Sequence, residues 1–150
     1  MAGERVTEEV GNVRILPGLD ALNRPYWTGG AEGQLLITRC TSCARYQHPP
    51  GPDCPVCRAA AEPVPVSGRG RIKSFTINRQ KWLPDMATPF VFAAVEIEEQ
   101  AGLYLCTNIV GCPVEQVDFD MAVEVCFLEQ EDVFLPMFRP SSAVGREDAA

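Results

Sequence analysis

Residues 39–59 read RCTSCARYQHPPGPDCPVCRA, and this stretch contains two Cys-x-x-Cys pairs separated by ten residues. A two-residue spacing lets both thiolates of a pair turn toward one point, and two such pairs joined by a hairpin form a tetrahedral site of four sulfurs. The predicted metal ligands are Cys40, Cys43, Cys54 and Cys57. Zinc suits this geometry best, and because tetrahedral thiolates also hold iron, iron stays open. The spacing argues against the remaining alternatives, which are unligated cysteines and a redox dithiol.

The loop between the two pairs is filled by prolines and a glycine: Pro49, Pro50, Gly51 and Pro52, with Pro55 inside the second pair. These residues favour extended and turn structure, so we expect the metal, and not a helix, to organise the loop. The same loop carries His48, the only histidine of the chain. Because four thiolates already complete the metal shell, His48 is predicted to pack or hydrogen-bond near the site; general-base work is the alternative.

Length and composition indicate an ordinary globular protein. The chain has 150 residues, of which 46% are apolar, enough for one domain or two small ones. No apolar run approaches the ~20 residues of a membrane span, and the charged N-terminus lacks the apolar core of a signal peptide. We therefore expect a cytoplasmic protein whose seven cysteines are reduced. Cys106 and Cys126 are predicted to be small core residues on strands, and Cys112 is left undecided.

The net charge of −7 hides a strong asymmetry along the chain. Residues 39–81 contain eight Arg or Lys and two acids, whereas residues 82–150 contain two Arg and thirteen acids. A basic patch on an acidic protein predicts a local anionic ligand and argues against wrapping nucleic acid. The candidate ligand-binding residues are Arg69, Arg71, Lys73, Arg79, Lys81 and Trp82. The first three alternate along one predicted strand and share a face, and the last three enter the following loop. The alternative is a solvated strand edge that binds nothing.

Most of the chain after the cysteines is predicted to form strands. The predicted strands are 35–39, 70–78, 90–97, 103–110, 123–128 and 134–138. A slip of the apolar phase predicts a β-bulge near Lys73–Ser74, and Pro136 indicates an edge strand. The run 90–97 is almost wholly apolar and is typical of a buried strand, while 113–121 has room for only a helical turn or two. Five strands after residue 67 with no long helix indicate a mainly β protein with a small Greek-key barrel of the OB type.

The N-terminal region has weaker signals. Residues 1–20 are predicted to be a flexible or partner-ordered arm, and a short helix is expected to begin near Pro25. Tyr26 and Trp27 are predicted either to pack onto the metal module or to dock on a partner. The predicted domains are 1–34 (arm and short helix), 35–66 (ribbon) and 67–140 (barrel), with a disordered tail over 141–150.

The order of these motifs resembles one known family. The matching stretches are LLITRCTSCARYQHPPGPDCPVC (35–57), VSGRGRIKSFTI (66–77), MAVEVCF (121–127) and LPMFRP (135–140). Together they resemble the rubredoxin-like zinc-ribbon plus OB-fold family catalogued as domain of unknown function 35, from about Pro25 to Pro140. The sequence departs from the family pattern after each second cysteine, where Ala44 and Arg58 replace the usual glycine of the metal knuckle. A glycine there relaxes the turn around the metal.

The resemblance implies a function that composition alone does not give. Members of this family are associated with acyl-CoA metabolism and act as non-catalytic subunits or fused domains beside thiolase-like enzymes, including steroid side-chain hydratases and aldolases. The resemblance thus implies a structural zinc, acyl-CoA as a ligand and a thiolase-like partner in a hetero-oligomer. No nucleophile elbow, phosphate loop or zinc-protease motif is present, so we expect no catalysis by this chain itself. The alternatives are a nucleic-acid-binding zinc ribbon with an OB-fold and a rubredoxin-like electron carrier.

Overall fold

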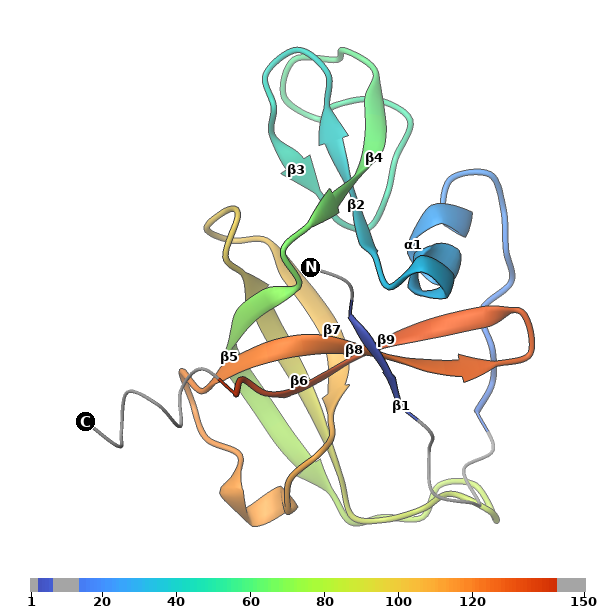
Figure 1. The fold of residues 1–150 in the computed structure, drawn as a ribbon, viewed down its shortest axis with the longest axis vertical. Coiled ribbons are helices and arrows are strands. Elements are labelled where there is room, and N and C mark those ends of the chain that lie inside the picture. The colour runs from blue at the N-terminus through green and yellow to red at the C-terminus, as the bar shows by residue number, and fades with distance from the viewer. Residues whose placement is uncertain (1–2, 7–13, 143–150) are drawn as a thin grey trace.

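The computed structural model describes residues 3–6 and 14–142, and it shows a three-stranded sheet standing on a β-barrel (Figure 1). The upper sheet contains β2 (Leu35–Cys40), β3 (Tyr46–Gln47) and β4 (Ala61–Val66), in the order β3-β2-β4 with antiparallel pairing. We call this sheet with its cysteine loops the ribbon. The connections between these strands form two loops at the far end of the sheet.

Within the described residues, the barrel is built from five strands. They are β5 (Arg69–Asn78), β6 (Phe90–Ile97), β7 (Tyr104–Ile109), β8 (Ala122–Gln130) and β9 (Val133–Pro140). The order β8-β5-β6-β7-β9 closes because β9 also pairs with β8 along its length. The register of β5 on β6 shifts between Ile72 and Ser74, which confirms the predicted bulge. A short 3₁₀ turn, η2 (Val114–Gln116), confirms that the β7–β8 connection holds only one helical turn. The predicted OB-type architecture is therefore confirmed.

The barrel core is formed by side chains that alternate inward along each strand. Phe127 and Phe138 are fully buried, together with aliphatic residues such as Ile72, Val95 and Leu105. The prediction of a buried strand over 90–97 was wrong for one face: Phe92 is 48% exposed, whereas its neighbour Val91 is buried. β6 is apolar on both faces but has a barrel interior on only one, so its other face lies at the surface.

The edge position predicted from Pro136 is corrected by the closure of the barrel. β9 lies between β8 and β7, but it pairs with β7 only where Phe138 faces Ile109. Along the rest of β9 that side carries no strand ladder, and the Thr107 hydroxyl donates a hydrogen bond to the Pro136 carbonyl (2.9 Å). The missing N–H of Pro136 is tolerated because this side of β9 is not hydrogen-bonded to a strand.

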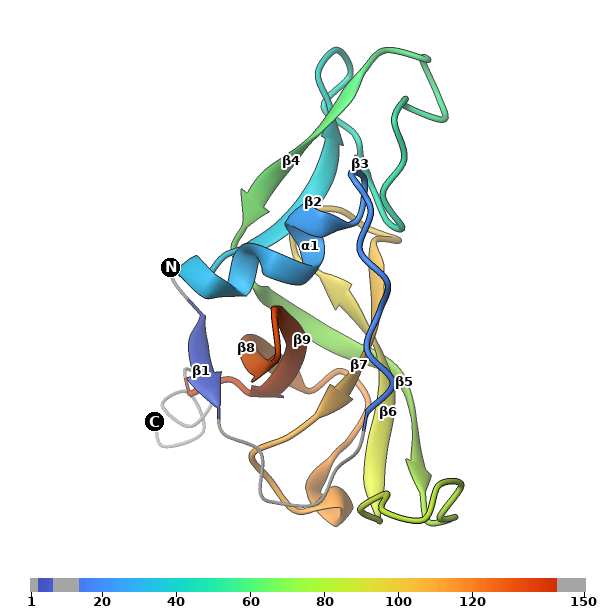
Figure 2. The ribbon, with the colours of Figure 1, turned by 90° about the vertical axis from the view of Figure 1, so that its right-hand side faces the viewer.

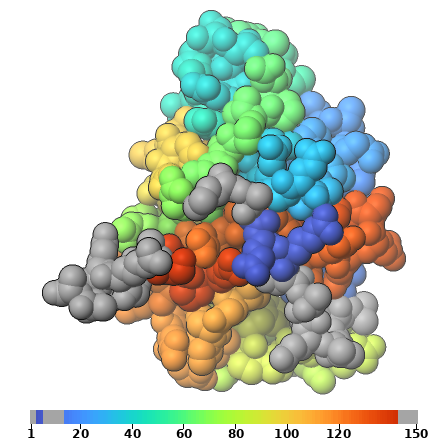
Figure 3. Space-filling view, viewed as in Figure 1, coloured from blue at the N-terminus to red at the C-terminus, as the bar shows by residue number. Residues whose placement is uncertain are grey.

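The N-terminal prediction is corrected in part. Glu4–Val6 form a strand, β1, that pairs in parallel with residues 126–128 of β8. Figure 3 shows these dark-blue residues packed at the surface beside the red and orange of β8 and β9. A three-residue strand is too short for a periodic pattern, so its partner strand and not its own sequence defines it. Residues 7–13 of the predicted arm and 143–150 of the predicted tail lie outside the described residues.

The short helix predicted near Pro25 is present as α1 (Arg24–Thr28), with Pro25 in its first turn, followed by the 3₁₀ turn η1 (Gly29–Glu32). Gly30 lies so close to the barrel that an added Cβ would approach Phe127 and Phe134 to 2.6 and 2.5 Å. The glycine therefore allows η1 to pack directly on β8 and β9. In the described part of the chain, no helix has the length and apolar character that a bilayer crossing requires.

The ribbon joins the barrel through buried side chains and a pair of hydrogen bonds. Leu35 and Ile37 of β2 belong to the same apolar cluster as the barrel core. Gln100, in the β6–β7 hairpin, donates to the Tyr46 carbonyl (3.1 Å) and accepts from the Tyr46 N–H (2.9 Å). Where the chain passes from β4 of the ribbon to β5 of the barrel, the Glu99 carboxylate accepts hydrogen bonds from the backbone N–H and the hydroxyl of Ser67. Ribbon and barrel are thus parts of one packed structure.

Candidate metal centre

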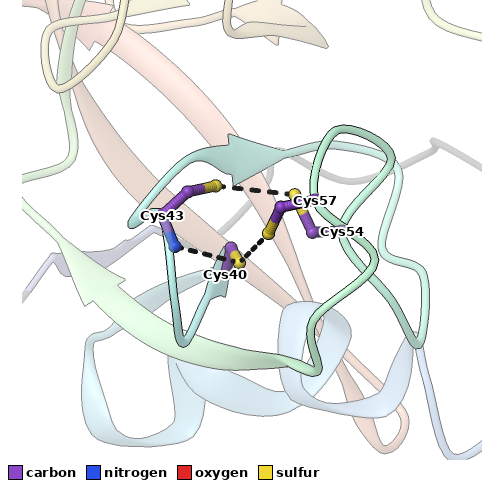
Figure 4. A group of neighbouring side chains, drawn as sticks. All are labelled: Cys40, Cys43, Cys54 and Cys57. Carbon is purple, nitrogen blue, oxygen red and sulfur yellow. Dashed lines mark hydrogen bonds between the residues drawn. The ribbon is translucent and has the colours of Figure 1, made fainter.

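The four predicted ligand cysteines come together at the tip of the ribbon (Figure 4). All four Sγ atoms lie within 4.8 Å of one another, with Cys40 to Cys57 at 3.4 Å and Cys43 to Cys54 at 3.6 Å. A zinc ion bonded to four sulfurs at about 2.3 Å requires sulfur–sulfur separations of about 3.8 Å. The donor set and its spacing therefore fit a tetrahedral metal ion. Cys40 and Cys54 are buried, while Cys43 and Cys57 are at the surface.

Backbone N–H groups point at two of the four sulfurs, those of Cys40 and Cys54, and favour their thiolate form. The Cys40 Sγ accepts from the N–H groups of Ser42 (3.3 Å) and Cys43 (3.4 Å), and the Cys54 Sγ accepts from Val56 (3.4 Å). The hydrogen bond from the Cys43 backbone is the largest influence that lowers the pKa of Cys40, to about 6. The pKa of Cys54 is lowered in the same way, by the backbone N–H groups of Cys57 and Val56. Since metals bind thiolates, these N–H groups prepare the site for a cation.

The two Cys-x-x-Cys loops have matching backbone geometry. The Cys40 N–H donates to the Arg45 carbonyl and the Cys54 N–H donates to the Ala59 carbonyl, both at 2.8 Å. Each loop then requires a left-handed residue directly after its second cysteine: Ala44 has φ = 63° and Arg58 has φ = 66°. These are the two positions where the family usually has glycine, so the chain keeps the knuckle conformation at a cost in backbone strain.

His48, in the loop between the two cysteine pairs, packs against Tyr26 of α1. Its ring lies 4.7 Å from the ring of Tyr26, measured between centroids. Burial lowers the pKa of His48, so the imidazole is neutral at physiological pH. His48 thereby links the cysteine loop to α1 and takes no place among the four sulfurs.

The candidate ligand-binding bases divide into two groups. Arg69 forms an ion pair with Glu98 (2.7 Å) and Lys73 forms one with Asp120 (2.8 Å). The guanidinium of Arg71 donates to the Asp120 carbonyl (2.8 Å). These three do share the exposed face of β5, but acidic residues from other strands and loops already occupy it. The hydrogen bond from Lys73 holds the pKa of Asp120 below its ordinary value, as expected for a formed pair.

Arg79, Lys81 and Trp82 lie in the loop between β5 and β6 and remain accessible. Among residues 3–6 and 14–142, no carboxylate forms an ion pair with Arg79 or Lys81. Trp82 is 70% exposed, and its indole N–H donates to the Asn78 side chain (2.9 Å). Two bases without ion-pair partners in the described residues therefore lie beside an exposed indole ring in this loop.

The two candidate partner-binding aromatics differ in exposure. Tyr26 is buried and packs against Trp27 and His48, which is the packing role considered for it above. Trp27 is only half-buried and keeps a surface for contact. Among the other cysteines, Cys126 is buried on β8 as predicted, but Cys106 is exposed on β7, which corrects the prediction of a core residue. Cys106 occupies the outward phase of β7, between buried Leu105 and Thr107.

Comparison with known proteins assigns both parts of this architecture. Residues 27–62 match the family model of the ChsH2 rubredoxin-like zinc ribbon domain, and residues 63–128 match that of the ChsH2 C-terminal OB-fold domain. A DUF35 domain-containing scaffold protein from Methanocaldococcus jannaschii is 30% identical over 96 residues, which cover 62% of this chain and 67% of that protein. The chain belongs to the DUF35 family.

Two further relatives are named as alpha subunits of CoA-ester hydratases. A probable enoyl-CoA hydratase alpha subunit from Thermomonospora curvata is 31% identical over 97% of this chain, and a 3-oxo-4,17-pregnadiene-20-carboxyl-CoA hydratase alpha subunit from Mycobacterium tuberculosis is 29% identical over 81% of it. The chain spans less than half of either subunit, 45% and 41%.

Two solved structures share the DUF35 fold. A chain of an Ltp2-ChsH2(DUF35) aldolase is 32% identical, with a TM-score of 0.75 over 83% of this chain and 98% of that one. A DUF35-family protein of unknown function from Sulfolobus solfataricus has a TM-score of 0.55 over 77% of this chain and 82% of that one, at 17% identity, and supports the fold.

Proposed function

We propose that this DUF35 chain is a non-catalytic accessory subunit, or the equivalent part of a larger subunit, that binds a thiolase-fold enzyme and supports its action on acyl-CoA. The observation that carries the proposal is the structural match to the DUF35 chain of the Ltp2-ChsH2 aldolase, which covers almost the whole of that chain. The hydratase alpha subunit names point to the same class of CoA esters, and one of them to a steroid side chain.

The proposed cofactor is a structural zinc ion held by Cys40, Cys43, Cys54 and Cys57. Four protein thiolates complete a tetrahedral shell, so the ion has no open position for a substrate or water. When bound, the metal cross-links the two cysteine loops. The residues themselves supply the thiolates and the backbone N–H groups that stabilise their charge.

The proposed contact with CoA is at Arg79, Lys81 and Trp82. Two exposed bases without ion-pair partners in residues 3–6 and 14–142 suit phosphate groups, and the adjacent exposed indole suits an adenine ring. Arg69, Arg71 and Lys73 suit this role less well, because a ligand would first have to displace their acidic partners. Trp27 is the proposed anchor for the partner enzyme, since half-buried aromatic residues are frequent at interface centres.

The decisive experiment identifies the enzyme that co-purifies with the chain or is encoded beside it. We expect a thiolase-like protein whose turnover of acyl-CoA depends on this chain, while the isolated chain turns over none. Full activity of the enzyme without the chain, or activity of the stringently purified chain alone, would contradict the proposal. A red protein containing iron would favour the electron carrier, and tight binding of single-stranded nucleic acid would favour the other alternative.

A double variant, Arg79→Ala with Lys81→Ala, tests the CoA contact by isothermal titration against acyl-CoA and, separately, against the partner enzyme. We expect weaker binding in at least one titration, with a larger difference at low salt, where exposed charges are least screened. Arg69→Ala with Lys73→Ala is the matched control, because it removes the same charge from bases that acids already hold. Unchanged affinity of the first variant in both titrations would leave the loop bases without a role.

A further inference from the structure

A groove of about 450 Å³ runs along the side of the barrel, and none of the four ligand cysteines lines it. It is lined by outward-facing residues of β6 and β7, by the loop after β5, by β9 and by residues 14–17, which run past the barrel in Figure 2. A hydrogen bond from the Arg14 guanidinium to the Asn108 side chain (3.0 Å) ties this segment to β7. At the end nearest the ribbon the groove meets Tyr26 and Trp27 of α1. Its volume is that of a small-molecule pocket.

The lining of the groove is mostly apolar. Phe92 lies in it and leaves 48% of its surface uncovered, and Leu83 and Met86 of the loop after β5 add flexible apolar side chains. Met137 and Trp27 contribute from β9 and α1. Large apolar side chains gathered in a concave surface are typical of a site for an apolar ligand.

Arg14, Thr107 and Asn108 also line the groove and each makes a hydrogen bond within the protein, whereas Tyr26 and Cys106 are the polar side chains proposed to contact a ligand. Tyr26 is 7% exposed and lines the groove, and within residues 3–6 and 14–142 its hydroxyl has no hydrogen-bond partner. Cys106, exposed on β7, lines the groove as well. Burial, followed by the nearby Cys106, raises the pKa of the Tyr26 phenol, so the hydroxyl keeps its proton and is a donor. Among the described residues the Tyr26 oxygen is not one of the fully buried polar atoms, so the hydroxyl opens onto the groove, where a ligand acceptor would pair with it.

We propose that this groove binds an elongated apolar molecule with one carbonyl group, whose oxygen accepts a hydrogen bond from Tyr26 while its chain lies over Phe92 and Cys106. The proposed occupant is an uncharged ketone or acyl group, because most of the groove surface is apolar and the Arg14 guanidinium in its lining already donates to Asn108. The proposal goes beyond the accessory role. It requires neither a partner enzyme nor the CoA contact at Arg79 and Lys81.

The test uses the full 150-residue chain with its metal and the methyl ketone 2-undecanone as probe. Trp82→Phe makes Trp27 the sole tryptophan, so its fluorescence reports on the groove. We expect saturable fluorescence change, and we expect the ketone to slow alkylation of Cys106 by N-ethylmaleimide. Cys112, which does not line the groove, provides the internal reference in the same digest.

Two variants locate the ligand. Tyr26→Phe removes one neutral hydrogen bond and should weaken ketone binding about three- to tenfold. Cys106→Phe fills the groove from an exposed position and should abolish binding. Tyr104→Phe, which removes an exposed hydroxyl from the same strand, is the matched control and should bind normally.

Several outcomes would overturn the inference. An unchanged Trp27 signal together with unprotected Cys106 up to the solubility limit of the ketone would show that the groove takes no such ligand. Normal binding by Cys106→Phe would place the ketone elsewhere, and normal binding by Tyr26→Phe would remove the proposed donor. Because Arg79→Ala with Lys81→Ala should leave ketone binding intact, failure here is separate from failure of the accessory role.

Discussion

The ribbon tip and the barrel are stabilised in different ways, although they belong to one chain. In the barrel, Phe127 and Phe138 are fully buried in an apolar cluster to which all five strands contribute. At the ribbon tip, residues 41–60 are mostly exposed, and Cys54 is the one residue among them that is buried. A segment this small cannot bury enough apolar surface to fold alone, so ligation of a metal replaces burial. The difference teaches that mutations in the two regions should act through separate physical causes.

The change from stabilisation by apolar burial to stabilisation by metal ligation occurs within the ribbon. Leu35 and Ile37 at the base of β2 are buried in the barrel's apolar cluster, whereas the sulfur cage begins at Cys40 at the end of the same strand. The base of the ribbon therefore depends on the barrel and its tip depends on the metal.

The largest expected effect follows Cys54→Ser, which removes one thiolate. The three remaining sulfurs cannot complete the tetrahedral shell, so we expect metal loss and local unfolding of residues 41–60, with the barrel still folded. Metal analysis and hydrogen exchange measure the two effects. Cys106→Ser, outside the cage, is the control and should keep its metal. Less than about half an equivalent of metal in fresh wild-type protein would count against a structural site, since such sites bind tightly.

The reverse experiment is Phe127→Ala in the barrel core. Truncating a fully buried aromatic residue should lower the free energy of unfolding by about 3–5 kcal/mol, through lost burial and the cavity left behind. Urea denaturation measures the loss. We expect the metal content at low urea to stay at the wild-type value. Release of metal from the variant while the barrel remains folded would show that the two regions are not stabilised separately.

A smaller gain is expected from Ala44→Gly together with Arg58→Gly. Both residues have positive φ, and glycine adopts this conformation without the Cβ clash that costs other residues about 1–2 kcal/mol. Against this, glycine is more flexible in the unfolded chain, so the net gain should be at most about 1 kcal/mol per site. The readout is resistance to metal removal by a chelator. Ala60→Gly, at a neighbouring position without positive φ, should have the opposite effect.

The smallest expected effect is that of Asp120→Asn. Asparagine accepts the positive φ of position 120, so the variant removes the ion pair with Lys73 and leaves the backbone alone. Because the pKa of Asp120 is lowered in the folded protein, its contribution is present above the unfolded pKa and is lost as pH falls through the folded one. Wild type and variant should differ slightly at neutral pH and converge in acid, as thermal unfolding will show. A difference that grows in acid would contradict this pairing.

The sequence predicted features that depend on local spacing. The two cysteine pairs, the bulge near Lys73 and the strand segments all follow from residues close together in the chain. What it missed depends on distant partners. Arg69 is held by Glu98 and Lys73 by Asp120, acids 29 and 47 residues away. No local pattern distinguishes such bases from free ones, and the charge asymmetry alone suggested a larger ligand site than the structure leaves open.

The groove was missed for a related reason. The run FVFAAVEI was interpreted as buried because it is apolar throughout, and Cys106 was placed in the core because free cysteines usually are. Phe92 of this run and Cys106 lie on the outward face of their barrel strands, and local sequence does not show which face of a strand points outward. The clue in the sequence was an excess of apolar residues on a strand that has one interior face.

The exchange of two hydrogen bonds between Gln100 and Tyr46 has a mechanical consequence. The side-chain amide of Gln100 makes the same pair of hydrogen bonds to Tyr46 that a neighbouring β-strand would make. It therefore connects the ribbon to the β6–β7 hairpin at a point separate from Ser67, where the chain passes from the ribbon into the barrel. Two separated contacts fix the orientation of the ribbon relative to the barrel, whereas a single contact would let the ribbon rotate about it. The four ligand cysteines lie at the end of the ribbon that is far from the barrel. A small rotation at the base of the ribbon would therefore displace the exposed Cys43 and Cys57 by a larger distance. Gln100 thus helps to fix the orientation of the ribbon relative to the barrel. The proposed partner enzyme would need this orientation to be constant if it contacted both the ribbon and the barrel.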